Sequence, residues 1–304
     1  MTERAPTLLS GYIYAMLAVL IWSGFNLVSR VGGTSPLTGF DTTALRFGVA
    51  GLILFPIWWW QRPVQLFDKR ILGLGIIGGI SYSLFVYSGF KFAPAAYAAI
   101  MLPGTMPFLI TLFAWLLLEE RPGKLRCFGL GVIALGVVCL ASDSWRSPGD
   151  LWLGSLLFLA GSACWSLYTV LSRRWAVRPW EATVGVVLIA AMIYLPVYLL
   201  FLPKTIAAAS WSIIAMQGFY QGVMASILAM IFYLRAVTAI GATGMGGFMA
   251  LVPAISGFAA IPLLDEPVSV TLGAGLVLTS VGAYFGSRPQ PLQVHGKFEK
   301  PTKS

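Results

Sequence analysis

The side chains that could hold a small molecule stand in a motif that this chain carries twice. The stretch from Trp22 to Arg30 returns between Trp165 and Arg173 at an offset of 143 residues (165 − 22), with tryptophan, serine, an aromatic residue and arginine at the same spacing. Tryptophan and tyrosine rings stack on flat groups, and the serine and asparagine side chains of the motif can donate and accept hydrogen bonds. The pattern predicts a binding surface suited to flat apolar side chains, with few polar contacts.

Other aromatic, methionine and polar residues lie on predicted spans that could share this surface. The candidate substrate-binding residues are Trp22, Ser23, Asn26, Tyr82, Tyr87, Tyr97, Met101, Trp165, Tyr168, Tyr233, Phe248 and Met249. Because only one face of a helix can line a cavity, packing or contact with lipid is the alternative role for each of them. The duplication favours a binding role for Trp22 and Trp165.

The interiors of the predicted spans lack the groups that hydrolysis inside a membrane requires. They contain no histidine, no aspartate pair and no Cys/His cluster, and the single histidine, His295, lies in the polar C-terminal stretch. Nucleophilic and metal-assisted hydrolysis depend on such groups. We therefore expect no enzymatic activity, no metal site and no cofactor.

The composition is that of an integral membrane protein. Hydrophobic residues make up 58% of the chain and charged residues 10%, and the mean hydropathy is +0.83, whereas a soluble domain carries about 25% charged residues. Ten segments reach the roughly 20 residues that a helix needs to cross the hydrocarbon core. The predicted fold class is an all-α membrane protein with ten transmembrane helices in contact with the lipid bilayer.

The net charge of +9 is explained by orientation in the membrane. Lysine and arginine are scattered between the predicted spans and do not gather on one face, so we expect no nucleic-acid partner. Most of them fall on the inner segments if the N-terminus is cytoplasmic. The positive-inside rule then predicts that both termini are cytoplasmic.

Each half of the sequence contains five predicted spans, and the matches between the halves keep their order. Pro107 and Glu120 match Pro253 and Glu266 at an offset of 146 residues (253 − 107). Because five is odd, the second half enters the membrane from the opposite side, and the repeat is inverted. The predicted units are residues 1–145 and 146–287, which meet at a polar, turn-rich stretch over 143–150. A disordered cytoplasmic tail is expected at 288–304.

Proline, glycine and charged residues mark where the halves could bend and close. Proline removes a backbone donor and clashes with the preceding turn, so the fourth and ninth spans should be kinked or locally unwound. The candidate hinge residues are Pro103, Gly104, Pro107, Gly244, Gly246, Gly247 and Pro253. Charge is costly in hydrocarbon, so charged residues at its edge are candidates for a gate. These gate residues are Arg30, Glu120, Arg173 and Glu266.

Inverted repeats are typical of secondary transporters, which hold substrate near the midplane and rock one repeat against the other. The five-span halves, the proline-containing spans that end in Leu117–Glu120 and Leu263–Glu266, and the tryptophan-serine motif resemble the drug/metabolite transporter superfamily. Within it the chain is similar to the EamA-type branch and its YddG-like amino-acid exporters. The resemblance implies export of amino acids, aromatic ones foremost, across a bacterial inner membrane. It also implies that spans 1, 3, 4, 6, 8 and 9 surround a central cavity, and we expect a monomer.

The substrate's charged groups and the energy source are open at this stage. A zwitterion's carboxylate could use amide groups freed where spans 4 and 9 unwind, and its ammonium the freed carbonyls. A sugar or nucleotide-sugar carrier and a cationic-drug exporter share the superfamily's architecture and are alternatives. All eleven acidic residues lie at span ends, in loops or in the tails. The sequence therefore predicts a facilitator without a proton carrier, with Arg46 and the gate acids as possible routes of indirect coupling.

Overall fold

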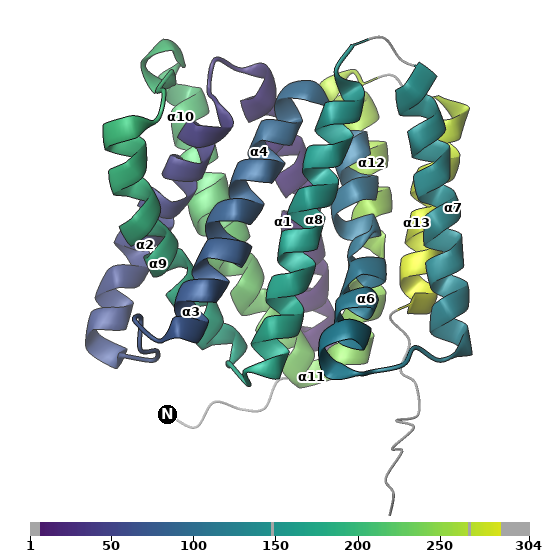
Figure 1. Cartoon of the computed structure of the whole chain (residues 1–304), viewed down its shortest axis with the longest axis horizontal. Coiled ribbons are helices and arrows are strands. Elements are labelled where there is room, and N and C mark those ends of the chain that lie inside the picture. Colours follow the sequence, from purple (N-terminus) through teal and green to yellow (C-terminus); the bar gives the residue numbers. More distant parts are fainter. Residues whose placement is uncertain (1–6, 147–148, 267–268, 287–304) are drawn as a thin grey trace, which may run out of the picture.

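The computed structural model describes residues 7–146, 149–266 and 269–286, and every regular element in this part of the chain is a helix. Figure 1 shows the helices standing side by side, roughly along one direction. Nine of them are long and apolar enough to cross a membrane, and α13, with 17 residues, is a shorter apolar helix that supplies the tenth span. The predicted ten-helix, all-α fold is confirmed for the described residues.

The first half contains spans 1 to 5, and two of these spans change helix type along their length. They are α1 (Leu8–Thr34), α2 (Gly39–Gln61), α3–η1–α4 (Lys69–Leu74, Gly75–Ser81, Tyr82–Phe92), α5–η2–α6 (Ala95–Ala99, Ile100–Gly104, Met106–Leu118) and α7 (Lys124–Arg146).

The second half contains spans 6 to 10 in the same order. They are α8 (Leu151–Arg174), α9 (Pro179–Phe201), α10–η4 with the start of α11 (Trp211–Gln217, Gly218–Leu228, Ala229–Met249), the remainder of α11 with α12 (Leu251–Leu264), and α13 (Val270–Gly286). The short helix η3 (Ile206–Ala208) lies in the connection between spans 7 and 8.

Spans 3 and 8 occupy equivalent places in the two halves, and both contain a π-helical segment with a pair of glycines four residues apart. A Cβ atom on Gly75 in η1 would lie 2.5 Å from Ile189 Cγ2, and one on Gly222 in η4 would lie 2.8 Å from Val49 Cβ. Small residues allow helices to approach this closely. As a result η1 packs on α9 of the other half, and η4 packs on α2.

Spans 4 and 9 are distorted near the prolines and glycines expected to distort them. Span 4 passes from α5 into the π-helical η2, which contains Pro103, before α6 begins. Span 9 is interrupted at Ala250, where α11 ends and α12 begins, three residues before Pro253. A separate break at Gly241, whose φ of 77° lies in the left-handed region that favours glycine, precedes this span. Both spans end in a left-handed acidic residue, Glu119 or Asp265, at positions equivalent in the repeat.

The boundary between the halves is more helical than the polar stretch 143–150 suggests. Helix α7 continues to Arg146, and α8 begins at Leu151. Asp143, Ser144 and Trp145 contain no helix breaker, so the helix can run on until the proline and glycine that follow. The predicted tail at 288–304 lies outside the described residues.

Candidate functional site

A cavity of about 560 Å³ lies between the two halves of the helix bundle. The spans expected to surround it, spans 1, 3, 4, 6, 8 and 9, all contribute side chains or backbone to its lining, and α2, α7, α9 and α13 add to them. Small-molecule sites commonly have volumes of about 300–1,000 Å³. The cavity is therefore large enough for a ligand the size of an amino acid.

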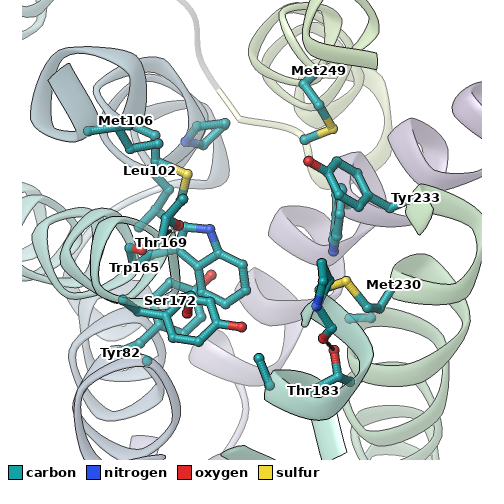
Figure 2. Close-up of a pocket in the computed structure, with 18 of the residues that line it drawn as sticks. Tyr82, Leu102, Met106, Trp165, Thr169, Ser172, Thr183, Met230, Tyr233 and Met249 are labelled. Carbon is teal, nitrogen blue, oxygen red and sulfur yellow. Dashed lines mark hydrogen bonds between the residues drawn. The ribbon is translucent and has the colours of Figure 1, made fainter. Parts of the chain in front are cut away.

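Aromatic side chains form two facing walls of this cavity. On one wall the ring centroid of Trp165 lies 5.1 Å from that of Tyr82 and 5.1 Å from that of Tyr168. On the other, Trp22 lies 5.6 Å from Tyr233. Figure 2 shows Tyr82 and Trp165 on one side of the open space and Tyr233, with its neighbouring methionines, on the other. A flat apolar group between the walls would contact rings on both faces.

The structure brings part of the predicted binding set to this cavity. The candidates in the lining are Trp22, Asn26, Tyr82, Trp165, Tyr168, Tyr233 and Met249. The candidates outside the lining are Ser23, Tyr87, Tyr97, Met101 and Phe248. Helix geometry explains the division, because Tyr87 stands five residues after Tyr82 and so faces another side of the same helix. Whether the lining residues bind substrate stays a prediction.

The predicted hinge residues divide in the same way. Pro103, Pro107 and Gly246 line the cavity, whereas Gly104, Gly244, Gly247 and Pro253 lie outside the lining. The carbonyl groups around the break in span 4 already have partners inside the protein. Thr105 Oγ1 donates to Met101 O at 2.5 Å, and Ser162 Oγ donates to Leu102 O at 3.1 Å. These two carbonyls are therefore poor candidates for binding a substrate's ammonium group.

The predicted gate residues form two ion pairs, each joining the halves. Arg30 Nε lies 3.2 Å from Glu266 Oε1, where α1 and α12 end, and Arg173 Nη2 lies 2.6 Å from Glu120 Oε1, where α6 and α8 end. Arg30 is equivalent to Arg173 in the repeat, and Glu266 to Glu120. Each arginine thus pairs with the glutamate of the other half, at opposite ends of the bundle, as an inverted repeat requires. We name these ends the Arg30 end and the Arg173 end.

The Arg30 end is closed. The side chain of Glu266 is 6% exposed and accepts hydrogen bonds from Ala95 N at 2.8 Å and Ala96 N at 3.2 Å, at the start of α5. Arg30 Nη1 donates to Phe90 O at 2.7 Å. The carboxylate accepts hydrogen bonds from amide groups that the first turn of a helix leaves free, and the positive end of the helix dipole stabilises its negative charge. The amide groups at the start of span 4 are thus occupied by the protein's own glutamate.

The Arg173 end is open. There the ion pair is exposed, with 51% of the Arg173 side chain and 44% of the Glu120 side chain accessible. Arg173 and Pro179 belong to the cavity lining and are exposed. At the inner limit of the cavity Phe25, Asn26 and Arg46 are buried. The cavity therefore runs from the middle of the bundle to the surface at the Arg173 end.

The charged groups of the described lining are Arg46, Arg126 and Arg173, and none of the lining residues is acidic. Arg46 is not among the binding residues expected from the sequence. A comparison of the two halves could have identified it. The offset of 140 residues that relates Asp41 to Glu181 also relates Arg46 to Val186, so an arginine stands in the second span where the repeat has an apolar residue. Among the described residues no three His, Cys, Asp or Glu side chains gather as a metal site.

Comparison with known proteins agrees with this architecture. The family model described as EamA-like transporter family matches residues 9–142 and again 152–288. The transporter YyaM of Bacillus subtilis is 26% identical over 90% of this chain and 93% of its own length. The protein of Escherichia coli named "Probable amino-acid metabolite efflux pump" is 26% identical over 91% of this chain and 95% of its length. The aromatic amino acid exporter YddG of Ancylobacter novellus is 31% identical over 64% of this chain and 69% of its length.

A solved crystal structure superposes with a TM-score of 0.61 at 25% identity, and the match covers 91% of this chain and 97% of the other. The family model accounts for both halves of the sequence, and the ten apolar helices supply the membrane spans that the model implies. The chain belongs to the EamA-like transporter family.

Proposed function

We propose that this protein exports amino acids, with aromatic ones foremost, across the inner membrane of a bacterium by alternating access. The observation that carries the proposal is the pair of equivalent ion pairs at opposite ends of the bundle, one buried and the other exposed beside the opening of the cavity. An inverted repeat can exchange these two arrangements by rocking its halves. In the orientation expected from the positive-inside rule, the Arg173 end faces the cytoplasm, so the cavity is ready to load cytoplasmic substrate.

The lining favours an amino acid over the other cargoes of this architecture. Rings of Trp22, Tyr82, Trp165 and Tyr233 face the space, which suits a flat side chain. The names of two relatives, an amino-acid metabolite efflux pump and an aromatic amino acid exporter, agree with this choice. A lipophilic cation would meet arginines and no carboxylate in the described lining, which disfavours a cationic-drug exporter.

The acids of the described chain also favour facilitated transport without a coupled proton. Glu266 is held by Arg30 and two amide groups, and Asp41, buried at the start of α2, accepts hydrogen bonds from Tyr198 Oη at 2.6 Å and from Thr38 and Thr205. A proton carrier needs an acid that can exchange protons in the transport path. We therefore infer that substrate moves down its own gradient and leaves the cell because the cytoplasm is richer in it.

Counterflow tests this proposal directly. Proteoliposomes loaded with unlabelled L-phenylalanine and held without a pH gradient or membrane potential are expected to accumulate labelled L-phenylalanine transiently, whereas protein-free liposomes are not. Exchange that occurs only under an imposed proton gradient would overturn the facilitative mechanism. Absence of exchange for every amino acid in a panel, with sugars or cationic drugs moving instead, would overturn the substrate class.

Labelling tests the orientation. A single cysteine in the 143–150 connection should react with an impermeant reagent added to intact spheroplasts, and a cysteine at Ser304 should react only after permeabilisation. The reverse pattern would contradict cytoplasmic termini and would turn the cavity toward the outside.

A further inference from the structure

Arg46 is a buried cation in the cavity wall for which the described chain supplies no counter-ion. It is the eighth residue of α2, it is 8% exposed, and it belongs to the cavity lining. The ion pairs of the described residues join Arg30 to Glu266, Arg173 to Glu120 and Arg178 to Glu181, and none includes Arg46. A charge held in a membrane interior without a partner is costly, so it is a mark of a binding or transport role.

The guanidinium is oriented by a hydrogen-bonded network behind it. Arg46 Nη1 donates to Tyr87 Oη at 3.0 Å, and Tyr87 Oη donates to Gln221 Oε1 at 3.1 Å. Gln221 Nε2 then donates to Ser29 Oγ at 3.0 Å and to Gln217 Oε1 at 3.2 Å. Because the Tyr87 proton is used by Gln221, the phenol oxygen must accept from Arg46. The network uses one nitrogen of the guanidinium, Nη1.

The other edge of the guanidinium has no hydrogen-bond partner among the described residues. Arg46 Nε is buried and has no hydrogen-bond partner. Three rings surround the guanidinium carbon, with centroids at 6.0 Å for Phe25, 5.7 Å for Phe47 and 5.7 Å for Tyr82. These distances lie near the outer limit of a cation–π contact, so the rings compensate the charge only in part. The edge formed by Nε and Nη2 matches the two oxygens of a carboxylate.

A buried acceptor in the same lining belongs to Asn26, the residue after Phe25 in the sequence. Asn26 Nδ2 donates to Ser256 Oγ at 3.0 Å, and Ser256 Oγ donates its own proton to Val252 O at 2.9 Å. The serine oxygen must therefore accept from Asn26, which identifies the amide nitrogen and leaves Oδ1 as the free acceptor. Asn26 Oδ1 is buried without a partner, although Asn26 belongs to the cavity lining. An ammonium group is a donor that would satisfy it.

The second half of the repeat does not reproduce this pair of groups. Val186 stands at the position equivalent to Arg46, and Thr169 at the position equivalent to Asn26, and both line the cavity. The lining is therefore asymmetric at these two positions, with a cation and a free acceptor contributed by the first half only. A ligand with a negative group, a positive group and a flat apolar part would use all three features of the lining.

We propose that Arg46 binds the carboxylate of the transported substrate and that Asn26 Oδ1 accepts a hydrogen bond from its ammonium group, so that the cavity selects zwitterions. The assignment rests on the proposed function and adds the groups that recognise the backbone of an amino acid. Arg46 then acts as a specificity-determining residue, since a cargo without a carboxylate leaves the guanidinium unpaired.

Substrate analogues test the assignment on the unaltered protein. L-Phenylalanine, L-phenylalaninamide, which lacks the carboxylate, and 3-phenylpropionate, which lacks the ammonium, would be compared by equilibrium binding in detergent and by counterflow. L-Phenylalanine is expected to bind at least about tenfold more tightly than the amide, because the amide leaves a buried charge without its partner. Equal affinity for the two compounds would overturn the role of Arg46 without any substitution.

Variants locate the effect. Arg46→Gln should weaken L-phenylalanine binding by about tenfold or more and change the affinity for the amide by no more than about twofold. Arg46→Lys keeps the charge but loses the two parallel N–H donors, so its affinity for L-phenylalanine should lie between those of the parent and Arg46→Gln. Arg62→Gln makes the same change at the exposed residue that caps the C-terminus of the same helix, outside the lining, and is the matched control. Asn26→Ala should weaken L-phenylalanine more than 3-phenylpropionate. Thermal melting of each variant separates loss of folding from loss of binding.

The outcomes distinguish the two proposals. If the unaltered protein moves no amino acid, the proposed function fails, and the carboxylate assignment fails with it. If L-phenylalanine is bound and transported but Arg46→Gln weakens the amide as much as the amino acid, the function stands and Arg46 has only a packing role.

Discussion

Replacing Glu266 with glutamine should release the closed end of the bundle. The carboxylate pairs with Arg30 and accepts hydrogen bonds from Ala95 N and Ala96 N, and it does so while almost fully buried. A glutamine side chain has the same size but offers one acceptor oxygen and an NH₂ group. The NH₂ would face the donors of Arg30 or of the helix start, so the substitution removes the ion pair and adds an unfavourable donor–donor contact.

The size of the effect follows from the burial of the two ion pairs. Breaking a buried pair costs about 3–5 kcal/mol, and the lower value is appropriate here because Arg30 keeps its bond to Phe90 O and is 21% exposed. A loss of about 3 kcal/mol changes the ratio of closed to open Arg30 ends by more than a hundredfold. The equivalent change at Glu120 removes an exposed pair worth about 0.2–1 kcal/mol, a factor of at most about six.

Distances between spin labels report this equilibrium. One label pair would replace Phe92 and Leu263 at the Arg30 end, and a second pair would replace Arg121 and Arg174 at the Arg173 end. Cys127, Cys139 and Cys164 would first be changed to serine or alanine. In Glu266→Gln the first distance should lengthen and the second shorten, whereas Glu120→Gln should keep both distributions near those of the parent. Unchanged distances in Glu266→Gln, or equal shifts in both variants, would refute the reasoning.

Two further predictions concern the cavity wall and the distorted spans. Alanine at Trp22 or Trp165 should weaken L-phenylalanine binding by about three- to tenfold through loss of ring contacts, with an unchanged gel-filtration profile; a loss of folding would return both residues to a packing role. Alanine at Pro107 and Pro253 should slow counterflow more than it weakens binding, because the breaks are where these helices bend most easily; weaker binding at an unchanged rate would show that the prolines shape the site.

The repeat made the fold and the ends of the bundle predictable from sequence. Two copies of one pattern, each with five apolar spans, predicted the inverted arrangement, and the positions of Arg30, Glu120, Arg173 and Glu266 at span ends marked the two ends of the bundle where the ion pairs form. Their partners were not predictable, because an ion pair between residues 236 positions apart (266 − 30) depends on how α1 and α12 meet. The difference in burial between the two ion pairs was not predictable either. The two halves have similar sequences, and the sequence does not show which end of the bundle is closed.

The cavity lining was less predictable for a geometric reason. Residue type shows that Tyr82 and Tyr87 are both aromatic, but only the rotation of α4 shows that Tyr82 faces the cavity and Tyr87 lies behind Arg46. Arg46 itself was treated as a charge near a span because sequence cannot show whether an acid pairs with it. That Asp41, five residues earlier in the chain, already accepts hydrogen bonds from Thr38, Tyr198 and Thr205 could be seen only in the structure.

The symmetry of the repeat also indicates what the open end lacks. At the closed end Glu266 holds the amide groups of Ala95 and Ala96, and Arg30 holds the carbonyl of Phe90. The offset of 146 residues places Gly241, residue 242 and Ala236 at the equivalent positions. In this structure the chain leaves the helical conformation at Gly241, with φ of 77° and ψ of 160°.

A helix start formed at Gly241 would offer Glu120 the amide groups that Ala95 and Ala96 offer Glu266. We infer that closing the Arg173 end moves Glu120 onto this turn and Arg173 toward the Ala236 carbonyl. Glu266 then loses its hydrogen bonds to the amide groups of Ala95 and Ala96. The label distances in Glu120→Gln report on this, because a glutamine there should leave the protein unable to hold the Arg173 end closed. Counterflow should then slow although the parent distances persist; undiminished counterflow in Glu120→Gln would contradict an exchange of equivalent contacts between the two ends.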